Sequence, residues 1–335
     1  MANRDIVAIG TSAGGVAALL FLAKGFRHNF PASVLVTIHL PSQFPSSLDE
    51  ILTRAGPLAA TFANEGEVMK KAHIYIAPPG RHLLVDDQRL WLGEGPRENG
   101  ARPAIDPMLR STASYCGNRA IGVVLTGTLG DGASGLWALS QMGGLTVVQD
   151  PSDAAFPEMP RTALNRLHPD HVVHLEEMPA LLDNLVRQPT SEPAPVPDNI
   201  HYEVEVARSG RTSMNEMDRF GQRSVLTCPD CGGVMWELKE GKLSRHRCHV
   251  GHAYTTELMM IGLDDGLRRA MASALRALDE RTALLRKLRD EAAYNGRSEL
   301  ADLWSQKMRD FQLEANVIGD AIKRLDRTAA QPATT

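Results

Sequence analysis

The sequence contains no apolar stretch long enough to span a membrane, and its start lacks the charged segment and long apolar core of a secretion signal. It also lacks an overall basic charge. It has 36 lysine and arginine residues and 40 acidic ones, and the resulting net charge of -4 does not favour a nucleic acid partner. We therefore expect a soluble, cytoplasmic protein, with no membrane insertion, that acts on proteins or small molecules.

Cysteine is scarce, with four residues in 335, and three of the four lie close to histidines instead of spreading out as a disulfide framework. CPDC at 228–231 and CHVGH at 248–252 have the spacing of a zinc ribbon. We expect a structural zinc ion, bound by Cys228, Cys231, Cys248 and His252, with His249 as the alternative fourth ligand. Free thiols in a small β-hairpin, or a redox Cys-x-x-Cys pair, are the competing interpretations.

A short apolar run from residue 6 breaks into Gly-Thr-Ser12-Ala13-Gly and continues as a helical pattern over 16–23. Small neighbours let the backbone turn sharply and leave Ser12 exposed, as at a nucleophile elbow. The N–H groups at the start of the helix, Ala13 among them, suit an oxyanion or a bound phosphate. The sequence has neither a GxGxxG spacing nor a Walker lysine here, which disfavours phosphate. A plain tight turn is the remaining alternative.

Strand and helix patterns alternate through residue 185 and predict an α/β fold with a doubly wound, mostly parallel, Rossmann-like sheet. His39 ends the predicted strand 33–39, and Asp131 lies in a glycine-rich corner after the predicted strand 119–125. The carboxyl ends of parallel strands meet at one edge, so Ser12 and His39 are expected to face one crevice. A lone histidine at a strand end is more often structural. Further strands are predicted at 72–77, 144–149 and 171–175, a hairpin at 81–92, and helices at 46–54, 106–116, 132–142 and 160–166.

The remaining segments suggest the domain organisation. A long loop at 93–106, rich in Gly, Pro and Arg, is either functional or a plain surface connection. We expect a catalytic domain at 1–187, a linker at 188–226, a zinc-ribbon-like module at 227–256 and a helical hairpin or coiled coil at 257–329. Within the linker only Tyr202–Val206 shows a pattern, and it is strand-like. The apolar stripe of the hairpin either packs on itself or offers a surface for a homodimer or another helical bundle.

Five motifs carry a family resemblance: GTSAGG, TIHLP, LTGTLGDGASG, ARPAIDPML and FPEMPRTAL. Through them, residues 6–185 resemble the catalytic domain of the CheB-type chemotaxis methylesterases. The resemblance implies a hydrolase without a catalytic cofactor, which removes glutamate γ-methyl esters from methyl-accepting chemotaxis receptors and in some members deamidates glutamine. It implies that Ser12 is the nucleophile, His39 the general base and Asp131 the residue that orients His39. Thr128 and Arg102, with Ala13, are candidates for the oxyanion or substrate site.

The sequence also departs from the family pattern. Gly127-Thr128-Leu129 stands where the family commonly has Gly-Met-Gly, and Leu129 in place of the second Gly is expected to constrain the loop and alter the groove and the substrate preference. No receiver domain precedes residue 6, so we expect no activation by phosphorylation in cis. The C-terminal CPxCGG and RCHxGHAY patterns resemble an extension of some standalone members, and we hypothesise that this module docks the enzyme on a receptor or a related signalling protein. A non-catalytic adaptor, or an esterase or amidase of another substrate, are the alternative functions.

Overall fold

The computed structural model describes residues 3–40, 46–86, 88–190, 192–241 and 243–329. Pro41, the last residue of the TIHLP motif, lies outside the described residues. The chain divides into two compact units, Met1–Met259 and Met260–Thr335. No helix in the described part of the chain is both long and apolar enough to cross a membrane.

The first unit contains a seven-stranded sheet in the order β3-β4-β2-β1-β7-β8-β9, in which every neighbouring pair is parallel. This confirms the predicted doubly wound sheet. All six residues of β1 and of β2 are buried, as their β-branched and small side chains predict. The strands are β1 (Ile6–Thr11), β2 (Ser33–Ile38), β3 (Ala59–Phe62), β4 (His73–Ile76), β7 (Ala120–Val124), β8 (Leu145–Gln149) and β9 (His171–Val173).

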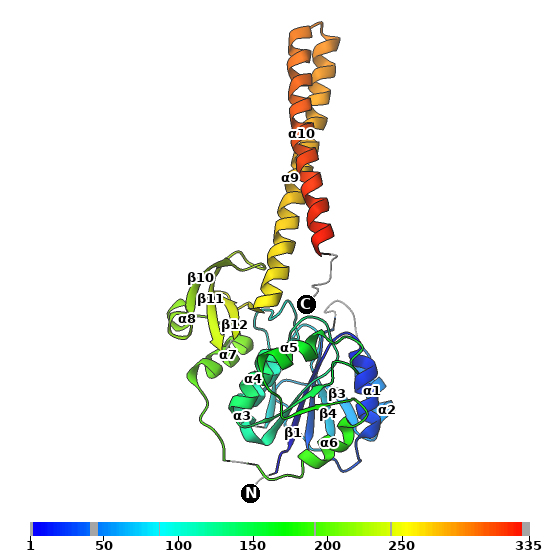
Figure 1. Ribbon diagram of the computed structural model, residues 1–335, viewed down its shortest axis with the longest axis vertical. Helices are drawn as coiled ribbons and strands as arrows, with labels where there is room; N and C mark the ends of the chain where they lie inside the picture. The colour runs from blue at the N-terminus through cyan, green and yellow to red at the C-terminus, as the bar shows by residue number, and fades with distance from the viewer. Residues whose placement is uncertain (1–2, 41–45, 87, 191, 242, 330–335) are drawn as a thin grey trace. The chain divides into compact units, whose positions relative to one another are not determined.

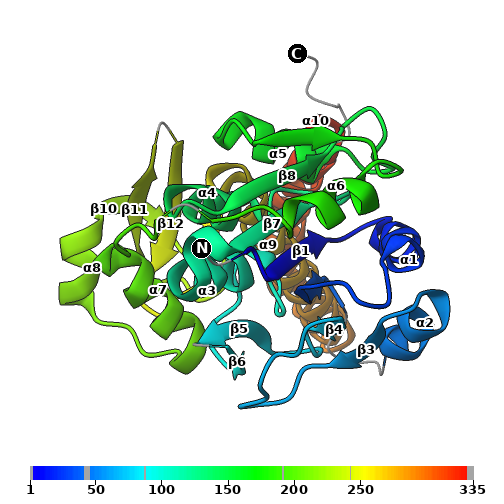
Figure 2. The same ribbon diagram turned by 90° about the horizontal axis from the view of Figure 1, so that it is seen from below.

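Helices cover both faces of this sheet, as Figures 1 and 2 show. The core on one face includes side chains of α1 (Gly15–Gly25), α2 (Leu48–Ala55) and α6 (Met178–Leu185). The core on the other face includes side chains of α3 (Ile105–Cys116), α4 (Ala133–Gln141), α5 (Glu158–Arg166) and the antiparallel hairpin of β5 (His82–Asp86) and β6 (Arg89–Gly93). The sheet therefore has a packed core on each face, and its strand ends remain available for a site.

In the rest of the first unit, the described residues between 198 and 255 form two helices and a small antiparallel sheet. The helices are α7 (Asp198–Ser209) and α8 (Met214–Phe220), and the sheet consists of β10 (Gln222–Thr227), β11 (Val234–Glu240), β12 (Leu243–Cys248) and β13 (Ala253–Thr255). We call residues 222–255 the Cys/His module. The strand-like interpretation of Tyr202–Val206 was wrong, because these residues lie in α7. Glu203 is a buried core position of that helix, so the alternation did not mark an exposed face.

The described residues of the second unit form a helical hairpin. Its first helix, α9, starts at Thr256 in the first unit and ends at Tyr294, and α10 runs from Ser298 to Ala329. Gly296 has a φ of +71° in the turn between them, a conformation that favours glycine. Leu285, Ala292 and Ala315 are buried, whereas Leu313 and Val317 are 65% and 67% exposed.

Candidate active site

Ser12, His39 and Asp131 lie at the carboxyl ends of three neighbouring strands. Ser12 follows β1, His39 follows β2 and Asp131 lies in the turn after β7. The chain leaves β1 for β2 on one side and later continues on the other side with β7, which makes this edge a topological switch point, where open α/β sheets form their binding crevices.

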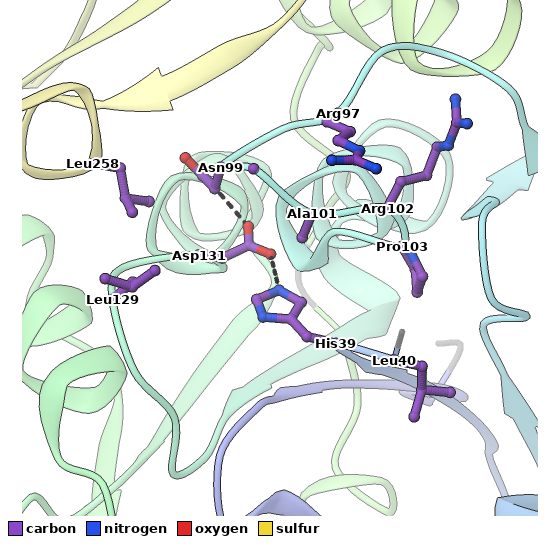
Figure 3. A pocket seen from close by; sticks show the side chains of 11 residues that line it. His39, Leu40, Arg97, Asn99, Ala101, Arg102, Pro103, Leu129, Asp131 and Leu258 are labelled. Atoms are coloured by element: carbon purple, nitrogen blue, oxygen red, sulfur yellow. Dashed lines mark hydrogen bonds and ion pairs between the residues drawn. The ribbon is translucent and has the colours of Figure 1, made fainter. Parts of the chain in front are cut away.

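The three side chains form a continuous series of hydrogen bonds. Nε2 of His39 lies 2.7 Å from Oδ2 of Asp131 (Figure 3), and Nδ1 lies 3.1 Å from Oγ of Ser12. An ionised carboxylate only accepts, so Nε2 carries the proton and Nδ1 accepts from the Ser12 hydroxyl. This arrangement leaves the imidazole ready to take the serine proton.

The Asp131 carboxylate is fully surrounded by donors. It is 1% exposed and accepts the backbone N–H groups of Ile105, Asp106 and Gly132 as well as the His39 ring. Ile105 and Asp106 open helix α3, whose N-terminus favours a negative charge. Burial by itself raises the pKa of Asp131, but the His39 ring and these N–H donors lower it below its usual value. Asp131 therefore stays ionised beside the imidazole.

Asn99 also donates to Asp131, and the sequence analysis did not identify this residue. Its Nδ2 lies 2.9 Å from Oδ1 of Asp131. Asn99 and Gly100 have φ values of +52° and +74°, and Glu98 and Ala101 exchange two backbone hydrogen bonds around them. This is a two-residue turn of type I′, for which Asn-Gly is the preferred sequence. The Asn-Gly dipeptide within the predicted loop was the signal that could have located the turn.

A second buried aspartate, Asp106, lies beside Asp131. Its carboxylate accepts the N–H groups of Gly132 at 3.0 Å and Gly135 at 2.7 Å, and Nδ2 of Asn99 at 2.8 Å. Burial, followed by the negative charge of Asp131, raises the pKa of Asp106 to about 7. The two carboxylates thus differ in charge near neutral pH, with Asp131 the more acidic.

A cleft of about 520 Å³ opens beside His39 and Asp131 (Figure 3). The predicted substrate candidate Arg102 lines this cleft, but its guanidinium donates at 3.0 Å to the carbonyls of Glu94 and Gly95. Arg97, which was not predicted, lines the same cleft and is exposed. The cleft therefore has a cationic border. The other lining residues are Leu40, Asn99, Gly100, Ala101, Pro103, Leu129 and Leu258.

Two backbone N–H groups are candidates for an oxyanion hole. In the described part of the chain, the N–H groups of Ala13 and Thr128 donate to no protein acceptor, whereas that of Leu129 donates to Oε2 of Glu158 at 2.8 Å. Leu129 has a φ of +68° and is 40% exposed, and its side chain lines the cleft. The departure from the family pattern at this position therefore shapes the groove.

The Cys/His module brings four ligand atoms together. Those of Cys228, Cys231, Cys248 and His252 all lie within 4.8 Å of one another. Three thiols and an imidazole are a donor set that suits a tetrahedral zinc ion. Nε2 of His252 faces Asp230 at 3.8 Å, a carboxylate that can orient the ring. His249 is exposed and outside the cluster, so the geometry favours His252 as the fourth ligand.

Residues 7–182 match the family model described as CheB methylesterase. A protein of Methanosarcina mazei, named protein-glutamate methylesterase/protein-glutamine glutaminase 2, is 34% identical over 192 residues, which cover 55% of this chain and 52% of that protein. A Xanthomonas campestris protein, named protein-glutamate methylesterase/protein-glutamine glutaminase 1, is 36% identical over 177 residues, which cover 52% of this chain and 49% of that protein. The chain thus spans about half the length of these relatives.

A solved structure matches the same part of the chain. It is the catalytic domain of Thermotoga maritima CheB methylesterase, with a TM-score of 0.53 and 30% sequence identity. The match covers 56% of this chain and 100% of the solved chain. The family model ends at residue 182, before α7, the Cys/His module and the helical hairpin.

Proposed function

Because the chain belongs to the CheB methylesterase family, we propose that it is a protein-glutamate methylesterase that hydrolyses glutamate γ-methyl esters on methyl-accepting chemotaxis receptors. The observation that carries the proposal is the series of hydrogen bonds from Ser12 through His39 to Asp131. It ends beside a cleft that is open to a protein side chain. The names of the relatives supply the substrate class.

The proposed reaction has two steps, acylation of Ser12 and hydrolysis of the acyl-serine, and all three triad residues take part in both. Ser12 attacks the ester carbonyl carbon while Nδ1 of His39 takes the hydroxyl proton. The tetrahedral intermediate expels methoxide, which His39 protonates to methanol, and an acyl-serine remains. Water then attacks the acyl group, again with His39 as the base, and the products are the glutamate carboxylate and free Ser12. Asp131 stabilises the imidazolium in both steps.

The developing oxyanion would be stabilised by the N–H groups of Ala13 and Thr128, which lie in the corners after β1 and β7. Arg102 and Arg97 would contact the substrate around the ester rather than the reacting atoms. A methyl ester needs less assistance to the leaving group than an amide. The same acyl-enzyme chemistry on a glutamine side chain releases ammonia, and we include this deamidation in the proposal because the relatives' names include a glutaminase.

The Cys3His cluster would hold a structural zinc ion, with no role in the ester chemistry. Four protein ligands leave no open coordination position for a substrate. Free thiols at this site suit a reducing compartment, which supports the proposal of a cytoplasmic enzyme. The helical hairpin, with exposed Leu313 and Val317, is the proposed surface for a receptor or a second copy of the chain.

The test is the release of labelled methanol from a methylated receptor signalling fragment by the zinc-loaded protein. We expect Ser12→Ala to lower kcat for methanol release by several orders of magnitude, because the nucleophile is removed. The matched control is Ser152→Ala, an exposed serine bonded to Asp150, which is expected to leave the rate unchanged. A folded wild type that releases neither methanol nor ammonia from several receptors would contradict the proposal and favour a non-catalytic adaptor.

A further inference from the structure

The orientation of the Asn99 side chain is fixed by its three partners. Its Oδ1 accepts the backbone N–H of Thr255 at 3.1 Å, and its Nδ2 donates to Asp106 and Asp131. A backbone N–H can only donate, so the amide oxygen must face Thr255 and the NH2 group must face the two carboxylates. Asn99 is 7% exposed, so none of these bonds is readily replaced by water.

Thr255 belongs to β13 of the Cys/His module, so the triad carboxylate is two hydrogen bonds away from this module. The backbone of Asn99 also donates to the Ala253 carbonyl at 2.7 Å. Ala253 directly follows the candidate ligand His252, whose carbonyl accepts the N–H of Cys248 at 2.9 Å. The turn that holds two of the four metal ligands therefore also starts the strand that holds Asn99.

Buried ion pairs also hold the turn at Asn99. Glu98, the neighbour of Asn99, is 1% exposed and accepts from Arg247 of β12 at 2.7 Å and from Arg110 of α3. Arg247 is adjacent to Cys248 and also bonds to Glu203 of α7 at 2.7 Å. The turn at 98–101 is thus fixed between the corner after β7 of the seven-stranded sheet and the Cys/His module.

From this geometry we propose that Asn99 is a positioning residue for the triad, and that the Cys/His module holds it in place through β13. Loss of the metal loosens the turn at Cys248–His252, β13 then releases the Asn99 amide, and Asp131 loses a donor that fixes its carboxylate against His39. The Cys/His module therefore supports the active site, in addition to any role in docking. The effect on turnover rests on the proposed function, whereas the effect on the His39 ring does not.

The test replaces Asn99 by aspartate and by glycine. Asp-Gly and Gly-Gly both suit a type I′ turn, so Asn99→Asp and Asn99→Gly keep the backbone while removing the NH2 donor. We expect kcat for methanol release to fall by about 10²-fold, because the base is misplaced, while KM changes less than about twofold. Asn64→Asp, at an exposed asparagine that donates to Glu67, is the control and is expected to match the wild type.

A second readout is the NMR signal of the His39 Nε2 proton, which a purely structural role of Asn99 would leave unchanged. The signal is assigned by its absence in His39→Gln. In the folded wild type we expect this proton to resonate far downfield, because Nε2 lies only 2.7 Å from Oδ2 of Asp131. We expect the signal to shift upfield or to be lost in both Asn99 variants while the rest of the spectrum stays folded. Removal of zinc by a chelator is expected to cause the same change in the wild type, reversed by added zinc, and little further change in Asn99→Gly.

The outcomes separate the two proposals. An unchanged His39 signal and unchanged kcat in both folded variants would overturn the positioning role. A chelated wild type that keeps the signal would overturn the control by the module. Failure of methanol release by the wild type would overturn the proposed substrate alone, because the His39 signal is read without a substrate.

Discussion

At the scale of single residues, the buried pair of Asp106 and Asp131 links the site to the stability of the fold. Asp131 is held ionised by its donors, and its charge is one reason why Asp106 titrates near pH 7. In the unfolded chain both groups titrate near pH 4. Between these pH values the folded protein therefore binds one proton at Asp106 that the unfolded chain does not.

This difference predicts how stability depends on pH. The contribution of Asp106 is fully present below about pH 4 and is lost as the pH rises through about 7, by up to roughly 1.4 kcal/mol per pH unit. Asp106→Asn removes the titrating group. We therefore expect the free energy of unfolding of the wild type, relative to the variant, to fall between pH 5 and pH 8.

Urea unfolding at the two pH values measures this difference. The comparison with the variant is needed because buried His82, whose pKa burial lowers, contributes with the opposite sign: its stabilisation is lost as the pH falls. Both proteins contain His82, so its contribution cancels. A wild-type-to-variant difference that is constant from pH 5 to pH 8 would contradict the raised pKa of Asp106.

At the scale of elements, the sequence predicted what depends on local patterns. Strands β1, β2 and β7 consist mainly of apolar and β-branched residues, all of them buried, and such runs are easily identified. Strand β3 was not predicted, because it has four residues at the edge of the sheet and only one of them is buried. Helix α7 was misread because a glutamate occupies one of its core positions.

In the corner after β7, the backbone at Gly127 packs closely against Met159 of α5 and Ser12 after β1. A Cβ atom on Gly127 would lie 2.0 Å from Sδ of Met159 and 2.9 Å from Cβ of Ser12. We expect Gly127→Ala to cost about 1–3 kcal/mol of stability by overpacking. It is also expected to lower kcat for methanol release by about 10²-fold, because Ser12 must move.

The control for this variant is Gly319→Ala in α10, where a Cβ atom would meet nothing within 4 Å. Alanine is the better helix former, so this change is expected to raise stability by up to about 1 kcal/mol with no effect on kcat. Thermal unfolding and initial rates measure both effects. A Gly127→Ala protein with wild-type kcat would show that Ser12 has room to keep its position.

At the scale of the whole molecule, the sequence indicated the candidate triad and the candidate metal ligands separately but not their connection. Besides the hydrogen bonds of Asn99, the connection includes buried charged side chains, which a sequence pattern assigns to the surface. They come from distant positions, as Glu98 and Arg247 show, and only the folded chain brings them together. Asn99 was missed for the same reason, because its partner Thr255 lies in another part of the first unit. The buried ion pairs form one cluster, which contains Glu98, Arg110, Arg166, Glu203, Glu240, Arg245 and Arg247.

Glu203 is the member whose loss should separate the Cys/His module from the catalytic sheet. Its carboxylate pairs with Arg245 and Arg247 of β12 and lies 3.5 Å from Arg110 of α3. Burial alone would raise the pKa of Glu203, but the three arginines lower it, so it is ionised at neutral pH. Glu203→Ala leaves these arginines buried with one partner fewer.

We expect Glu203→Ala to cost about 3–5 kcal/mol of stability, because removing one partner from a buried ion-pair cluster leaves its positive charge less compensated. Glu50→Ala, which breaks the exposed pair with Arg54, is the control and should cost less than about 1 kcal/mol. Urea unfolding measures the cost, and hydrogen exchange at the Thr255 amide reports whether β13 still holds Asn99. Faster exchange at Thr255, with strands β2, β1 and β7 still protected, means that the module has come away from an intact seven-stranded sheet. A loss below about 1 kcal/mol would mean that hydrophobic packing, and not the buried charges, holds the module in place.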